Sequence, residues 1–160
     1  MSAVHGLRFT LVDAPKQVIQ SQWEELFYAW VKQEKPSLRG EVVVSFVIPA
    51  EMKELYYHSF GEHTATDVLS FRYQAQGISP DSEIESSAGE IIICTDVARK
   101  NAKKLHVSPG NELMTLFVHG LLHLLDYDHA TNAERAAFKA KTHAIMRVVN
   151  QEPAPLWLLS

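Results

Sequence analysis

The chain has 160 residues, 46% of them hydrophobic, and its single cysteine, Cys94, has no partner for an internal disulfide. This length suits one domain, and the composition is ordinary for a globular protein with one core. The formal net charge of −4 argues against the broad basic surface of many nucleic-acid-binding proteins, so any contact with RNA has to be local. Met1–His5 has no signal-peptide pattern, and no apolar run is long enough to span a bilayer. These features indicate a protein of the reducing cytoplasm.

The first half of the chain predicts a strand, helix, strand unit followed by a short helix. Apolar side chains from Val18 to Trp30 recur at helical spacing and form one stripe. A continuous apolar run after Pro36 suits a strand that is buried on both faces. Because the two strands flank a helix, we expect a right-handed parallel crossover. The expected elements are a strand over Leu7–Val12, a helix over Lys16–Gln33, a strand over Val42–Ile48 and a helix over Glu51–Phe60.

The second half predicts two further strands, separated by a polar segment, and then three helices. Residues 74–88 are rich in Ser, Gly, Pro and acidic residues. They predict a mobile loop, either a plain connection or a cover over a functional site, whose flanking strands can pair antiparallel. Ser108-Pro109 and the capping-box pattern Thr131 to Glu134 predict two helix starts. The strands are expected over Val68–Tyr73 and Gly89–Cys94, and the helices over 95–105, from Pro109 through the histidine-rich segment, and from Thr131 to Val149.

Three of the eight histidines lie close together in the second half, at His119, His123 and His129. Residues four apart lie on one face of a helix, so the first two can share one ion. The preceding run, Leu113–Val118, contains Thr115 as its one polar residue and predicts a helix that is buried on all sides. Buried imidazoles need partners. We therefore predict that these three histidines bind one zinc ion (Zn2+).

The histidine offsets are those of metzincin proteases, which place a glycine seven residues after the first histidine and a glutamate base directly after it. This chain has Asp126 at the first of these positions and Gly120 at the second. Aspartate visits the left-handed αL conformation more readily than most residues, so a chain reversal at Asp126 is expected. The zinc geometry of a metzincin is thus kept, while its general base is absent.

The segment HGLLHLLDYDH, residues 119–129, resembles the HGxLHLxGYDH signature of the YbeY family of bacterial zinc-dependent endoribonucleases. Thr66–Phe71 resembles the TDVLSF segment of that family, and Gly89–Ile93 resembles its following GDI strand with glutamate for aspartate. The resemblance covers residues 66–129. The family usually has an arginine six residues before the TDVLSF threonine, where this chain has Phe60.

The resemblance implies a metal-dependent, single-strand endoribonuclease that takes part in 16S rRNA 3′ end maturation and ribosome quality control. It implies zinc as the cofactor, with an rRNA precursor and a ribosomal subunit as partners. The catalytic and substrate-binding residues stay open. The carboxylates closest to the family motifs are Glu90, Asp126 and Asp128, and Asp128 could instead orient a ligand histidine.

Two alternative functions stay open. Phe60 in place of the arginine is consistent with a non-enzymatic ribosome-assembly factor that contains a structural zinc. The metzincin offsets favour a zinc peptidase, although Gly120 opposes it.

A basic cluster on the predicted helix over 95–105 is the best local candidate for binding phosphate. Arg99, Lys100, Lys103 and Lys104 lie within six residues and share one side of the helix. They could hold an RNA backbone without reading its bases. The alternative is an ordinary solvated helix face.

The elements together predict an α+β fold, with a four-stranded mixed sheet packed by helices and a central metal-binding helix. We expect a single domain over residues 1–150. Residues 151–160 form an apolar tail, in which Leu156–Leu159 either folds onto the body or contacts a partner.

Overall fold

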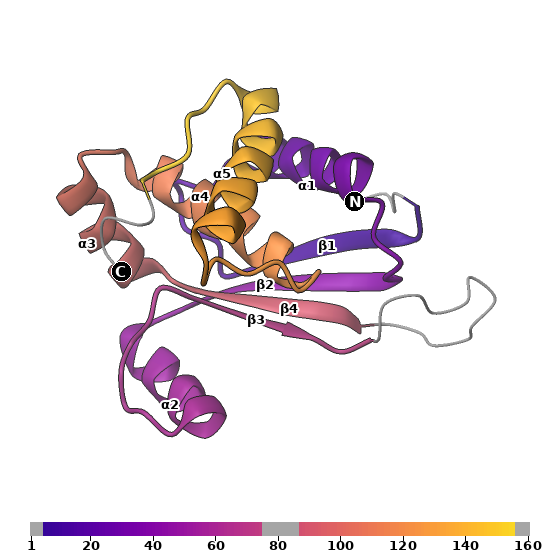
Figure 1. Cartoon of the computed structure of the whole chain (residues 1–160). Helices are drawn as coiled ribbons and strands as arrows, with labels where there is room; N and C mark the ends of the chain where they lie inside the picture. Colours follow the sequence, from indigo (N-terminus) through magenta and orange to yellow (C-terminus); the bar gives the residue numbers. More distant parts are fainter. Residues whose placement is uncertain (1–4, 75–86, 156–160) are drawn as a thin grey trace.

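The computed structural model describes residues 5–74 and 87–155 and has the predicted α+β architecture, with one four-stranded sheet (Figure 1). The strand order is β1-β2-β4-β3. β1 and β4 pair parallel with β2, whereas β3 pairs antiparallel with β4, so both expected pairings are confirmed. The strands are β1 (Leu7–Val12), β2 (Gly40–Val47), β3 (Val68–Arg72) and β4 (Ser87–Cys94).

Helices cover the two faces of the sheet unequally. Helices α1, α4 and α5 lie on one face and α2 lies on the other (Figure 1), where Val97 of α3 also packs against the apolar cluster. None of the described helices is both long and apolar enough to cross a bilayer. The helices are α1 (Gln20–Glu34), α2 (Pro49–Phe60), α3 (Thr95–Leu105), α4 (Pro109–His123), α5 (Asn132–Met146) and a short 3-10 turn, η1 (Arg147–Val149).

Strand β4 separates two apolar clusters. Ile91 and Ile93 belong to the large core that α1, α4 and α5 complete. Ile92 and Cys94 belong to a smaller cluster with Met52 of α2. Because successive strand residues point to opposite faces, this division tells which face each β4 side chain occupies.

Several boundaries differ from the sequence prediction. Helix α1 begins at Gln20 rather than Lys16, because a turn in which Val18 N–H donates to the Pro15 carbonyl oxygen at 3.0 Å precedes it. Of the predicted mobile loop, Gln74 is buried and its amide nitrogen donates to the carbonyl oxygen of Arg39 at 2.7 Å. Residues 75–86 of that loop, and Leu156–Leu159 of the predicted tail, lie outside the described residues.

Helix α4 is the buried central element that the sequence predicted. Its first turn is capped by Ser108, whose Oγ accepts a hydrogen bond from Asn111 N–H at 3.1 Å, with Pro109 at the first helical position. All residues from 111 to 122 except His119 are buried. The described start of the predicted tail also packs on this helix, since Ala154 N–H donates to Thr115 Oγ1 at 2.9 Å.

Two glycines of the sheet region leave no room for a side chain. A Cβ atom added at Gly120 would lie 2.7 Å from Ile91 Cγ2, and one added at Gly89 would lie 2.7 Å from the Phe71 carbonyl oxygen of β3 and 2.9 Å from Leu124 Cδ2. These distances are shorter than real side-chain contacts, and at position 120 a larger residue would force α4 and β4 apart. The contact at Gly120 therefore determines which side of α4 faces the sheet.

A buried carboxyl group lies at the start of α4. Glu112 is 1% exposed, and within the described part of the chain its Oε1 has no hydrogen-bond partner. Burial, and then the neighbouring Asp67 carboxylate, raise the pKa of Glu112 to about 7. Burial also raises the pKa of Asp67, which accepts a hydrogen bond from Asn101 Nδ2 at 3.3 Å. Ionisation of Glu112 therefore opposes folding.

We expect Glu112→Gln to stabilise the fold at alkaline pH and to change it little at acidic pH. An acid whose pKa rises on folding contributes its full stability below the unfolded value of 4.5, and this is lost as the pH rises toward the folded value of about 7. Above that range the variant should be more stable than wild type by up to about 3 kcal/mol. Urea unfolding across this pH range measures the difference, and parallel pH profiles would contradict the assignment.

We expect Gly120→Ala to destabilise the fold by about 1 to 3 kcal/mol, because the added methyl group overlaps Ile91. In an Ile91→Ala background the overlap is gone, so the same substitution should cost nothing and can even stabilise α4 through the higher helix propensity of alanine. Free energies of unfolding for the four proteins give the coupling. An equal effect of Gly120→Ala in both backgrounds would refute the close contact.

Candidate metal centre

The three histidines that the sequence singled out meet at the C-terminal end of α4. His119 and His123 lie on successive turns of the helix, and His129 returns from the loop between α4 and α5. Each offers a ligand atom, and these atoms all lie within 4.8 Å of one another. The ring centroids of the first two are 4.5 Å apart, and that of His129 is 5.3 Å from both. We refer to these three residues as the histidine triad.

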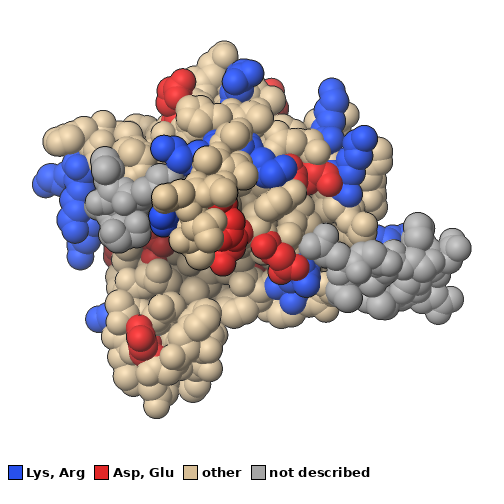
Figure 2. Space-filling view, in the orientation of Figure 1, with Lys and Arg blue, Asp and Glu red and all other residues tan. Residues whose placement is uncertain are grey.

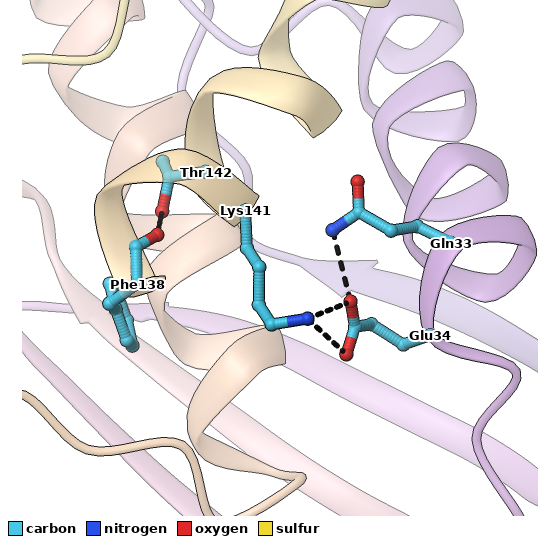
Figure 3. A network of polar contacts seen from close by, with 5 residues as sticks. All are labelled: Gln33, Glu34, Phe138, Lys141 and Thr142. Atoms are coloured by element: carbon cyan, nitrogen blue, oxygen red, sulfur yellow. Dashed lines mark hydrogen bonds and ion pairs between the residues drawn. The ribbon is translucent and has the colours of Figure 1, made fainter. Parts of the chain in front are cut away.

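One apolar ring supports the whole triad. The Phe138 ring of α5 lies 4.8, 5.2 and 5.6 Å from the rings of His119, His123 and His129. Helix α5 is tied to α1 by an ion pair of 3.0 Å between Lys141 Nζ and Glu34 Oε2, whose side chain is 4% exposed (Figure 3). Phe138 therefore sits on a helix whose position against the core is fixed by contacts outside the triad.

The surroundings keep the rings of His119 and His123 uncharged. Burial, and then the neighbouring His123 and His129, lower the pKa of His119 to about 3. Burial, followed by the effect of His129, also lowers the pKa of His123. Metals bind the neutral form of imidazole, so these two rings are ready to bind at neutral pH without losing a proton.

The donor set fits a metal ion. Nδ1 of His119 is buried and has no hydrogen-bond partner among the described residues, although a buried polar group of this kind normally has one. Three imidazoles are also the ligand set of catalytic zinc sites, which keep a fourth position open. An ion shared by the histidine triad would account for the convergence of three rings at this end of α4.

The predicted chain reversal after His123 occurs at Asp126, which has a φ of 66°. Arg72, the last residue of β3, donates from Nη1 to Asp126 Oδ2 at 2.6 Å and to the carbonyl oxygen of Leu124 at 3.3 Å. The sequence analysis missed Arg72. Its one signal was a charged side chain at the end of an apolar strand, which points to no particular partner.

Other contacts hold the loop beyond this turn. Lys141 Nζ lies 4.6 Å from the centre of the Tyr127 ring. Asp128 Oδ1 accepts a hydrogen bond from the backbone N–H of His129 at 2.7 Å, and Arg135 Nη1 donates to the carbonyl oxygen of His129 at 3.4 Å. Asp128 thus contacts the backbone of a candidate ligand, and its predicted role in orienting a histidine ring stays a prediction.

Two residues that the comparison with the family motifs singled out lie on the other face of the sheet. Gly89 and Ile91, the neighbours of Glu90 in β4, face α4, so Glu90 faces the other side of the sheet. Its carboxylate accepts a hydrogen bond from the Tyr73 hydroxyl at 2.9 Å. Phe60 ends α2, is 59% exposed and packs on Tyr56 at a ring distance of 4.9 Å. Of the three carboxylates considered, Asp126 and Asp128 alone lie in the loop that carries His129.

Comparison with known proteins gives matches to one family. A family model described as Endoribonuclease YbeY matches residues 10–150. A protein named Endoribonuclease YbeY from Micrococcus luteus is 34% identical over 118 residues, which cover 73% of this chain and 75% of that protein. The protein of the same name from Staphylococcus aureus strain Newman is 34% identical over 134 residues, covering 82% and 86%.

A relative of the same name from Frankia casuarinae is 36% identical over 112 residues, and the matched region covers 66% of this chain but 56% of the longer relative. Among solved structures, the solution structure of a Thermotoga maritima protein has a TM-score of 0.57 at 23% identity, covering 89% of this chain and 91% of that one. This structural likeness supports the fold alone. The family match and the sequence relatives show that the chain belongs to the YbeY family.

Proposed function

We propose that this chain is a zinc-dependent endoribonuclease that cleaves single-stranded RNA during 16S rRNA 3′ end maturation and ribosome quality control. The observation that carries the proposal is the histidine triad, half-buried and with ligand atoms within 4.8 Å of one another, in a chain of the YbeY family. An rRNA precursor on a ribosomal subunit would be the substrate and partner, in the cytoplasm. Residues 1–150 would form the catalytic domain and residues 151–160 a tail.

His119, His123 and His129 would hold the ion. When bound, zinc in such a site has an open coordination position, at which it can activate water and polarise a phosphoryl oxygen. Phe138 closes the site on the side of α5, since its ring lies within 5.6 Å of all three histidine rings. RNA therefore has to approach from the exposed side of the loop, where Asp126 and Asp128 lie.

A basic surface on α3 offers a second contact for RNA. We name as the α3 basic face the exposed side chains of Arg99, Lys100, Lys103 and Lys104, which gather at the left of Figure 2. Arg99 also pairs with Asp96 at 3.2 Å, while Ala98 and Ala102 form the buried side of the helix. Helix α4 follows α3 in the chain, and its start is about 15 Å from His119 along the helix at 1.5 Å per residue. A single strand that reached from the region of α3 to the histidine triad would therefore run along α4.

The peptidase alternative has no base at the metzincin position. A side chain at position 120 would start 2.7 Å from Ile91 Cγ2, so this position packs against the sheet. The assembly-factor alternative makes the same zinc prediction as the endoribonuclease but predicts no RNA cleavage, so a cleavage assay distinguishes the two.

We expect His119→Ala to lose both stoichiometric zinc and RNA cleavage, because one of three ligands is removed. His58→Ala, which changes an exposed histidine of α2, is the matched control and should keep both. Zinc content is measured by elemental analysis, and turnover is measured on single-stranded RNA and on casein. Zinc-loaded wild type that leaves RNA intact would refute the endoribonuclease, and cleavage of casein would favour the peptidase.

We expect the triple variant Lys100→Gln, Lys103→Gln, Lys104→Gln to bind single-stranded RNA more weakly and with a weaker dependence on salt. Each lost phosphate contact lowers the slope of log K against log salt by about 0.7 for single strands, so the slope should fall by up to about 2. The control removes three exposed lysines from other helices, Lys32, Lys53 and Lys139. Equal salt slopes for the two triple variants would exclude the α3 basic face as an RNA contact.

A further inference from the structure

The turn between the second and third candidate ligands contains a residue in an unfavourable backbone conformation. Asp126 has a φ of 66°, in the left-handed region that glycine enters freely and residues with a Cβ enter at a steric cost. A conformation of this kind persists where the surroundings hold it in place. The contacts of Asp126 therefore bear directly on whether His129 reaches the other two histidines.

A single guanidinium nitrogen of Arg72 bridges the two ends of this turn. Nη1 donates to the Leu124 carbonyl oxygen, just after the last residue of α4, at 3.3 Å and to Asp126 Oδ2 at 2.6 Å. Arg72 comes from β3, an element that packs against α4 through a hydrogen bond of 3.1 Å between Ser70 Oγ and the Gly120 carbonyl oxygen. The sheet that positions α4 thus also holds the turn that follows it.

The ion pair between Arg72 and Asp126 is partly exposed, so it affects the conformation of the turn more than the stability of the whole fold. The side chains of Arg72 and Asp126 are 26% and 70% exposed, and ion pairs at such positions add little to global stability. Backbone hydrogen bonds also close the turn, from Asp126 N–H to the His123 carbonyl oxygen at 3.1 Å and from Tyr127 N–H to that of Leu122 at 3.4 Å. To these local bonds Arg72 adds a side-chain contact from another element of the fold, to the turn and to the end of the preceding helix.

We propose that Arg72 is a positioning residue for the metal centre. By holding Asp126 in the left-handed conformation, it directs the chain back so that His129 joins His119 and His123. An aspartate adopts this conformation at a steric cost that such a partner helps to offset, whereas a glycine adopts it without that cost. The inference rests on the proposed metal site and extends it to a residue 54 positions from Asp126 in the sequence.

Arg72→Met tests the role, because it keeps an unbranched stem and removes the guanidinium. The zinc dissociation constant, measured by competition with a chromophoric chelator, should rise by at least about 10-fold, as for other residues that orient metal ligands. The urea midpoint of the metal-free protein should change little. A residue with a merely structural role would shift the urea midpoint instead.

Asp126→Gly supplies the second half of the test. In this background the turn no longer depends on Arg72, so Arg72→Met should change the zinc dissociation constant by less than about threefold. Arg8→Met is the matched control, since Arg8 forms another exposed ion pair, with Glu41 at 3.4 Å. This control should bind zinc as wild type does.

Two results would overturn the inference. The first is an unchanged zinc dissociation constant in Arg72→Met. The second is that Arg72→Met raises the zinc dissociation constant equally in the wild-type and Asp126→Gly backgrounds. Failure of the metal site itself looks different, because wild type would then bind no stoichiometric zinc at all. A wild type that binds zinc, together with an unaffected Arg72→Met, would refute the role of Arg72 and leave the proposed function intact.

Discussion

The contact between Gly120 of α4 and Ile91 of β4 determines where the histidine triad lies. Position 120 points at the sheet, and a Cβ atom there would lie 2.7 Å from Ile91 Cγ2. His119 and His123 consequently lie on a neighbouring side of the helix and face Phe138 of α5. A larger residue at 120 would move α4 away from β4, and both rings would move with it. The candidate metal centre thus depends on a packing contact that contains none of its ligands.

The large core contains buried polar groups that lower the stability of the fold. A buried nitrogen of His119 and a buried oxygen of Glu112 lack hydrogen-bond partners in the part of the chain that the structure describes, and each such group costs about 1 to 3 kcal/mol. Burial also lowers the pKa of His119 to about 3, which keeps its ring uncharged and able to bind a metal. A shared ion would give His119 a partner, whereas Glu112, whose pKa is raised to about 7, can take up a proton.

Features that depend on neighbouring residues could be predicted from the sequence, whereas contacts between residues far apart in the chain could not. The cap at Ser108, the histidine spacing and the reversal at Asp126 each depend on neighbouring residues, and the structure has all three. Strand alternation separates Glu90 from Ile91 in any register, but which of them faces α4 depends on how the helix packs. The contact of Arg72 with Asp126 joins residues 54 positions apart, and no local pattern predicts it.

X-ray absorption spectroscopy at the zinc edge, on protein purified with its metal, tests the central claim most directly. The account predicts one zinc per chain with three imidazole nitrogens at about 2.0 to 2.1 Å and one oxygen ligand. In the spectrum of His129→Ala, the number of imidazole ligands of zinc should fall by one. A sulfur ligand, which Cys94 alone could supply as the single cysteine of the chain, or fewer than three imidazoles in wild type would contradict the histidine triad as the metal centre.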